Sequence, residues 1–167
     1  MEPGDPLHRL HPIVKRVDDG RRFILLEESA ARWRGSRGYV ENVAAAVALA
    51  TVSPRAAGRV YNVAEAESVT EMEWTRRVAR TAGFTGQVIT VPTDRALAHL
   101  KFPGNTAQHW VAGSSRIRKE LGYTEPIPFD EGLARTVAWQ RANPPADFDP
   151  KQFDYAAEDA AFPASAA

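Results

Sequence analysis

The sequence contains no cysteine and no excess charge of either sign, since 21 lysine and arginine residues oppose 21 aspartate and glutamate residues. Without cysteine the chain can form no disulfide bond, thiolate metal site or thiol nucleophile, which fits a reducing cytoplasm. A zero net charge gives no overall field that would attract nucleic acid. We therefore predict a cytoplasmic protein that does not bind nucleic acid.

Long apolar runs are also missing. The longest, from Val43 to Val52, is half alanine and is too short to span a bilayer. The N-terminal stretch, MEPGDPLHRL, lacks the basic and then apolar pattern of a signal peptide. The sequence therefore indicates no association with a membrane.

The motifs of a nicotinamide-cofactor site are absent as well. A Rossmann half places the dinucleotide pyrophosphate on a helix N-terminus that follows a strand and a glycine-rich turn. The G-x-x-G pairs, Gly35/Gly38 and Gly83/Gly86, stand before strand-like segments instead, so we interpret both as turns. No tyrosine precedes a lysine by four residues, so a proton-transferring Tyr-x-x-x-Lys pair is excluded. We expect the chain to bind no cofactor and to be catalytically incomplete by itself.

Metal-ligand clusters with a suitable spacing are missing too. His8 and His11 stand three residues apart with Asp5 nearby, but zinc needs three or four fixed ligands and nothing downstream supplies a matching pair. No Gly-x-Ser-x-Gly nucleophile elbow is present either. We predict no metal site and no catalytic residue in this chain.

Helical and strand-like patterns alternate along the chain, which predicts an α/β fold. Apolar spacing with start and stop residues predicts helices over residues 12–19, 40–51, 71–82, 115–121 and 131–142. β-prone runs predict strands over residues 22–26, 37–40, 59–63 and 87–91. Thr70 and Glu73 are spaced for a capping box, and Asp130 is expected to cap the last of these helices.

The composition changes beyond Pro145, where Asp, Ala, Phe and Pro follow one another without periodicity. We interpret residues 1–145 as one α/β lobe and residues 146–167 as a mobile tail or a strap laid over its surface. On this interpretation the tail is dispensable for folding.

Five short segments, taken together, carry a family pattern. They are residues 3–6 (Pro-Gly-Asp-Pro), residues 37–44 (Arg-Gly-Tyr-Val-Glu-Asn-Val-Ala), residues 59–63 (Arg-Val-Tyr-Asn-Val) with the helix that begins after Thr70, residues 114–123 and residues 131–139. In this order they resemble the extended short-chain dehydrogenases/reductases, the NAD-dependent epimerase/dehydratase family. The resemblance covers nearly the whole chain to Pro145 and matches the C-terminal, substrate-side portion of that family.

The resemblance implies a small mixed α/β substrate-binding lobe of a Rossmann-type enzyme, with the Rossmann half absent. The family's glycine-rich turn and Tyr-x-x-x-Lys pair would lie upstream of Met1, so we expect their absence to reflect truncation rather than divergence. NAD(P) is thus implied for an intact parent enzyme, and not for this chain.

Candidate substrate-binding residues follow from the same resemblance. It places the loop that contains Pro3, Gly4 and His8, together with Arg9, near the reacting end of the substrate cleft. The alternative for His8 and Arg9, which are loop residues close to a terminus, is that both are exposed to solvent and bind nothing.

Arg37 matches the arginine that contacts a substrate phosphate in the sugar-nucleotide members, a task suited to a guanidinium because it forks onto an oxyanion. The alternative for Arg37 is an ion pair with Glu27 or Glu41. Tyr39 follows on the same segment, where packing is the competing role.

Two departures from the family pattern weaken an assignment to a diphosphate sugar. Residues 101–110 lack the second arginine that sugar-nucleotide members often carry, and Gly113 stands near a common family aspartate. Trp33, Phe102 and Trp110 are expected to line the pocket, with membership of the core as the alternative.

The sequence therefore predicts the substrate-binding part of an epimerase/dehydratase-like oxidoreductase, inactive alone, with a small-molecule and sugar-like substrate. The alternative is a stand-alone binding or interaction module derived from that lobe. As a protein partner we expect a missing Rossmann half or, in its place, a second copy in a homodimer. Exposed apolar residues should mark this interface, with Leu7, Leu10, Ile13 and the Ala44–Ala50 helix as candidates.

Overall fold

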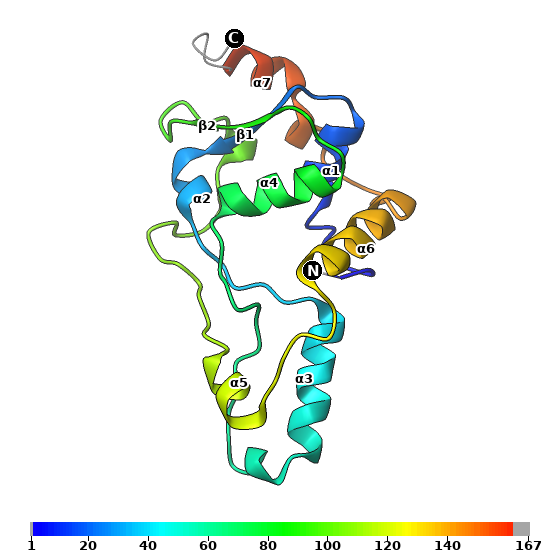
Figure 1. Cartoon of the computed structure of the whole chain (residues 1–167). Coiled ribbons are helices and arrows are strands. Elements are labelled where there is room, and N and C mark those ends of the chain that lie inside the picture. Colours follow the sequence, from blue (N-terminus) through cyan, green and yellow to red (C-terminus); the bar gives the residue numbers. More distant parts are fainter. Residues whose placement is uncertain (1, 162–167) are drawn as a thin grey trace.

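The computed structural model describes residues 2–161, in which helices outnumber strands (Figure 1). The helices are α1 (His11–Asp18), α2 (Glu28–Arg32), α3 (Val40–Val52), α4 (Glu71–Thr81), α5 (Ser115–Leu121), α6 (Phe129–Ala142) and α7 (Tyr155–Ala161). The strands are β1 (Phe23–Glu27) and β2 (Gln87–Val91), and the single-turn 3-10 helices are η1 (Pro54–Ala56), η2 (Ala98–Leu100) and η3 (Pro150–Phe153). The mixed α/β fold predicted from the sequence is confirmed.

The two strands form a parallel sheet in which Phe23 lies opposite Gln87 and Glu27 lies opposite Val91. Parallel strands require a long crossover, and here the connection contains α2, α3 and α4. Leu25 and Val91 bury their side chains together on this sheet, as expected for apolar and β-branched residues on a pleated surface.

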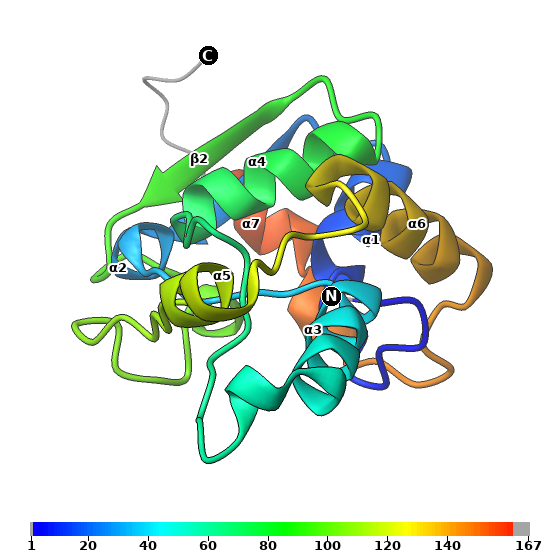
Figure 2. The same cartoon turned by 60° about the horizontal axis from the view of Figure 1, so that its bottom comes forward.

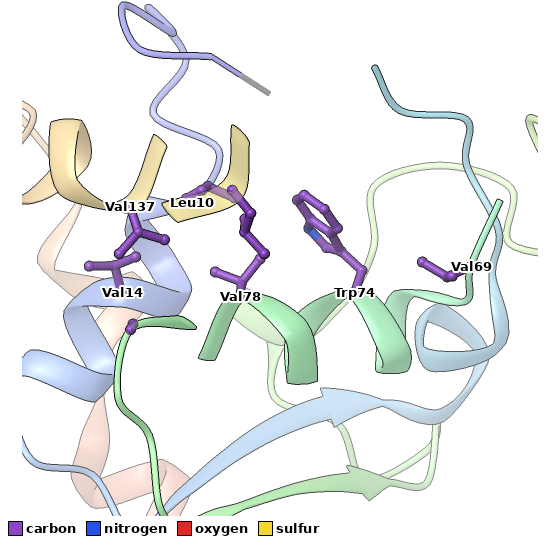
Figure 3. Packing of buried hydrophobic residues seen from close by; sticks show 8 residues of the cluster. Leu10, Val14, Val69, Trp74, Val78 and Val137 are labelled. Atoms are coloured by element: carbon purple, nitrogen blue, oxygen red, sulfur yellow. The ribbon is translucent and has the colours of Figure 1, made fainter. Parts of the chain in front are cut away.

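The main core lies where α1, α4 and α6 meet (Figure 3). Its buried members are Leu10, Val14, Val69, Trp74, Val78, Ala82, Leu133 and Val137. The predicted capping box is present, because the Thr70 hydroxyl accepts from the Glu73 amide and the Glu73 carboxylate accepts from the Thr70 amide. The cap fixes the start of α4, which turns Trp74 and Val78 inward.

α3 and α5 project away from the sheet in Figure 1, and Figure 2 brings these two helices toward the viewer. They share a small cluster of their own, built on Ala46, Ile117 and Tyr123. α3 has no charged residue after Glu41, yet Val47 and Val52 on it are exposed to 58% and 78%. A helix that is apolar over most of its surface normally packs against other elements, so the exposure of Val47 and Val52 is unusual.

Two of the predicted strands are wrong. Residues 37–39 and 59–63 lie outside any helix or strand, and Val40 is the first residue of α3. The amide of Glu65, two residues beyond the second segment, donates to the Arg37 carbonyl at 2.8 Å. Both segments have a β-prone composition, but a strand also needs a neighbouring strand, and residues 2–161 supply none here.

Three further predictions need correction: the cap of α6, the exposure of Leu10 and the number of helices. Asp130 does not cap α6, because the helix begins at Phe129 with Pro128 in the capping position, and Asp130 lies in the first turn. Leu10 is buried to 4% exposure and not left for an interface, whereas Leu7 is 71% exposed. α2 and α7 had no counterpart among the predicted helices.

Residues 146–161 lie against α1 through a buried ion pair. Glu158 of α7 is fully buried, and its Oε1 lies 2.5 Å from Arg16 Nη2 and 3.1 Å from His99 Nε2. Arg16 also stacks on Phe153 and donates to the Gln152 carbonyl at 2.8 Å. We propose that the chain divides into a lobe, residues 1–145, and a second segment, residues 146–167. The described part of the second segment acts as a strap over α1.

Among residues 2–161 there is no helix long and apolar enough to cross a membrane.

Candidate substrate pocket

A cavity of about 460 Å³ opens between the N-terminal loop, the segment after α2, the start of α4 and α6. It is lined by Asp5, Arg9, Leu10, Trp33, Gly35, Ser36, Arg37, Glu71, Trp74, Trp110 and Thr136. Its size falls within the range of about 300–1,000 Å³ that is usual for small-molecule sites. The structure thus brings Arg9 and Arg37 to one pocket, although the sequence separates them.

Arg37 is held by an ion pair with Glu71, the first residue of α4, and its guanidinium stacks over Trp74 at 4.4 Å. The predicted alternatives, Glu27 and Glu41, are therefore the wrong partners. Burial raises the pKa of Glu71, and the charge of Arg37 opposes that shift. The Gly35 carbonyl accepts a second hydrogen bond from Arg37, and a guanidinium with five N–H donors retains others for a ligand.

Asp5 organises the loop that carries Arg9. Its carboxylate is buried and accepts hydrogen bonds from the backbone amides of Leu7 at 3.2 Å and Arg9 at 3.0 Å. Arg9 Nη2 lies 3.3 Å from the same carboxylate, and 60% of the Arg9 side chain is exposed. This arrangement holds an exposed cation at the pocket edge on a fixed backbone.

Pro3, Gly4 and His8 do not line this pocket. Gly4 adopts a positive φ of 86° that turns the chain toward Asp5. His8 also has a positive φ, 46°, and its ring stacks on Trp139 at 5.5 Å while its Nδ1 lies 3.1 Å from Gln140 Nε2. These contacts tie the loop to α6, so His8 has a packing role here.

Tyr39 is fully buried, and its hydroxyl donates to Glu41 at 2.8 Å. Its ring lies so close to Gly132 of α6 that a Cβ on that glycine would stand 2.8 Å from it. Tyr39 therefore anchors the start of α3 against α6 and does not reach the pocket. A ligand contact for it remains a prediction without geometric support.

The predicted aromatic wall is present in part. Trp33 and Trp110 line the pocket and meet edge to face, with ring centres 5.8 Å apart. Trp33 donates its indole N–H to the Gln108 carbonyl at 2.9 Å, which fixes its orientation. Phe102 packs against Trp33 from outside the lining, with ring centres 5.1 Å apart.

A smaller cavity of about 180 Å³ adjoins the first and shares Gly35, Arg37 and Trp74 with it. Its own walls include Glu65, Arg77 and Phe129. Val69 and Trp74, both labelled in Figure 3, line it along the start of α4. Arg37 thus stands at the junction of two neighbouring spaces.

Glu65 and Glu71 were missed by the sequence analysis. Glu71 stands 34 positions from Arg37, and no local pattern marks it as the counter-ion of that arginine. Glu65 follows a segment that was assigned to a strand, and no local pattern sets it apart.

A dinucleotide does not fit the strand-to-helix junction that this part of the chain contains. At the end of β1, the buried Glu27 carboxylate accepts from the amides of Ser29 at 2.9 Å and Ala30 at 2.8 Å. Those amides open α2, and they would otherwise be the donors for a pyrophosphate. A fixed carboxylate at this junction repels the anionic pyrophosphate.

Among residues 2–161 no group of three acidic or histidine side chains could hold a metal ion.

Comparisons with known proteins agree with this partial fold. No family model matches the chain. Over 105 residues, or 63% of its length, the chain is 31% identical to a dTDP-glucose 4,6-dehydratase from an Actinoplanes strain. The UDP-glucose 4-epimerase of Thermus thermophilus, solved with NAD, is 26% identical and superimposes with a TM-score of 0.56 over 79% of this chain and 39% of its own. RMD from Pseudomonas aeruginosa, solved with NADPH, shares the fold alone, with 14% identity and a TM-score of 0.60 over 86% of this chain and 45% of its own.

The chain therefore carries part of the fold of an extended short-chain dehydrogenase/reductase, and the resemblance to the NAD-dependent epimerase/dehydratase family is confirmed. Two curated relatives, both dTDP-glucose 4,6-dehydratases, are matched over only 30% and 29% of their lengths.

Proposed function

We propose that this chain is the substrate-binding part of an NAD-dependent epimerase/dehydratase-like oxidoreductase and is not catalytic alone. The observation that carries the proposal is the convergence of Arg9 and Arg37 on one pocket of about 460 Å³. Both predicted cations reach the same space, and the aromatic rings of Trp33 and Trp110 form another wall. That combination suits a ligand with an anionic group and a flat or apolar part.

Residues 101–110 supply no second arginine, but Arg9 brings a second cation to the pocket, so a sugar nucleotide is the substrate class that we propose. The planar guanidinium of Arg37 can hydrogen-bond a phosphate through two donors, whereas an ammonium would act as a point charge. The cofactor and the proton-transferring pair would belong to a Rossmann half, because Glu27 occupies the donors at the β1–α2 junction.

Titration calorimetry of the purified chain tests this proposal. NAD⁺ and NADP⁺ should bind more weakly than about 1 mM, which corresponds to about −4 kcal/mol. The diphosphate dTDP should bind measurably, and Arg37→Lys should weaken it about tenfold, because lysine keeps the charge and loses the fork. Arg32→Lys, on an exposed residue outside the pocket, is the matched control and should change nothing.

Two results would contradict the proposal. Submillimolar binding of NAD⁺ would show that the chain holds a dinucleotide site after all. Equal dTDP affinity in the parent chain and Arg37→Lys would remove Arg37 from the substrate site.

The protein partner that we propose is a Rossmann-type half, with a second copy of the chain taking its place when that half is missing. The supporting observation is the exposed apolar surface of α3 and the groove of about 330 Å³ beside it. The groove is lined by Ala46, Val47, Ala50, Thr51, Ala56, Arg59, Tyr61, Val63 and Ile117. The β-prone residues 59–63 run along it without a strand to pair with among residues 2–161.

A stand-alone binding module is the rival function. The buried Arg16–Glu158 pair favours the stand-alone module, because the strap covers α1 as expected for a domain that folds by itself. A module of this kind would bind its ligand as a monomer and would ignore an added Rossmann half.

A further inference from the structure

Glu65 lies between α3 and α4 and lines the cavity of about 180 Å³ next to Arg37. Its Oε1 is buried and accepts no hydrogen bond from any residue in the described range 2–161. Most buried polar atoms in native proteins have a partner, so a buried carboxylate oxygen without one needs an explanation.

The groups around Glu65 compensate its charge only in part. Burial raises the pKa of Glu65 and the charge of Glu125 adds to that shift, whereas a hydrogen bond from the Tyr39 backbone and the charge of Arg118 oppose it. Arg118 is itself engaged in an ion pair with Glu125, so its charge is shared. A carboxylate that is desolvated in this way gains from any donor that enters the cavity.

The size and position of the cavity limit what that donor can belong to. About 180 Å³ is below the range of about 300–1,000 Å³ for a whole small-molecule ligand, so the cavity suits one part of a larger molecule. Arg37 lines both cavities and is placed to bind an anionic group at their junction. The part that enters the smaller cavity is therefore the part next to that anionic group.

We propose that Glu65 accepts a hydrogen bond from a hydroxyl of the sugar ring that adjoins the phosphate held by Arg37. The two cavities then form one site with two compartments, in which Arg37 binds the phosphate and Glu65 selects the ring beside it. This proposal rests on the sugar-nucleotide function proposed above. In a sugar nucleotide such a ring is either the ribose or the sugar at the far end of the diphosphate, and both present the same hydroxyl chemistry.

Calorimetry with two pairs of nucleotides distinguishes the two rings. UDP and 2′-deoxy-UDP differ only in the ribose 2′-hydroxyl, and dTDP and dTDP-glucose differ only in the hexose. If the ring is the ribose, Glu65→Ala should weaken the binding of UDP about tenfold and leave 2′-deoxy-UDP unchanged. If the ring is the hexose, Glu65→Ala should weaken dTDP-glucose about tenfold and leave dTDP unchanged. In either case the substitution removes a hydrogen bond to a charged acceptor. The isosteric Glu65→Gln keeps one oxygen acceptor and should lose less.

The control is Glu131→Ala, which removes an exposed acid that pairs with Arg135 outside both cavities. Its affinities should equal those of the parent chain, and melting curves should show that all variants are folded. If the parent chain binds nucleotides and neither Glu65 variant alters either pair, the inference about Glu65 is overturned and the proposed function stands. If the parent chain binds none of the four nucleotides, the proposed function fails, and the inference fails with it.

Discussion

Glu27 closes the junction between β1 and α2 with its own side chain. Burial raises the pKa of Glu27, but hydrogen bonds from Thr93, Ser29 and Ala30 outweigh that effect and lower the pKa to about 2 from an ordinary value of 4.5. A depressed carboxyl pKa means that the folded state favours the charged form. The stabilisation is therefore complete above the ordinary pKa and disappears as the pH falls toward 2.

We expect Glu27→Gln to lower the free energy of unfolding by about 2 kcal/mol at pH 7, where the carboxylate is charged. The difference from the parent chain should shrink steadily between about pH 4.5 and pH 2, because both side chains are then neutral. Urea unfolding at a series of pH values measures it. Glu28→Gln, on the exposed neighbouring residue, should change stability by no more than about 0.5 kcal/mol. A pH-independent difference would contradict the role of the charge.

Of the candidate residues, Arg9 and Arg37 line the pocket, but the contacts predicted for Arg37 were wrong. Arg37 was found through a family segment, and it does line the pocket. Its partner Glu71 is 34 positions away, and nothing local distinguishes it from Glu27 or Glu41 as a counter-ion. Tyr39 shares the segment with Arg37 but points into the core, because side-chain direction depends on how α3 meets α6.

Among the elements, those with signals in their own residues were predicted well. α4 has its capping box, and α5 ends at Gly122, whose φ of 70° gives the left-handed turn that stops a helix. Residues 37–40 and 59–63 failed as strands because strand formation depends on a neighbour that no local pattern reveals. α7 was missed for a related reason, since long-range contacts hold it, among them the ion pairs Arg16–Glu158 and Arg21–Asp159.

The strap gives a prediction opposite to the one made from composition. A chain ending at Pro145 loses Glu158 together with Phe153 and Gln152, which also contact Arg16, and so exposes the Arg16 guanidinium to water. The cost is therefore smaller than the about 3–5 kcal/mol that is typical when a buried ion pair loses one partner and the other stays buried. We expect the shortened chain to lose more than about 2 kcal/mol of stability in chemical unfolding.

Two point variants separate the ion pair from the rest of the strap. Glu158→Gln in the full chain should reproduce much of the loss, whereas Asp159→Asn, on a residue whose side chain is 56% exposed, should cost less than about 1 kcal/mol. An unchanged melting temperature for the chain ending at Pro145 would show that Arg16 finds other partners.

For the whole molecule the main question is what covers α3. Beyond Asn42 the helix carries no polar residue except Thr51. It projects from the main core (Figure 1), and a mainly apolar groove lies beside it. Monomeric proteins rarely leave an apolar patch larger than about 600 Å² in water. Domain interfaces within one chain typically bury about 600–1,500 Å², so a Rossmann-type half would provide cover of the right kind.

We expect the chain alone to self-associate through α3, most simply as a two-fold dimer, because a second copy can cover the same apolar face. Light scattering at micromolar concentration should show the dimer. Val47→Glu places a charge in the groove and should give a monomer, whereas Val111→Glu, on a similarly exposed valine outside α3, should not. A co-expressed Rossmann half should form a complex with the parent chain and not with Val47→Glu. A parent chain that stays monomeric and ignores the added half would favour the stand-alone module, since its exposed helix would then need no partner.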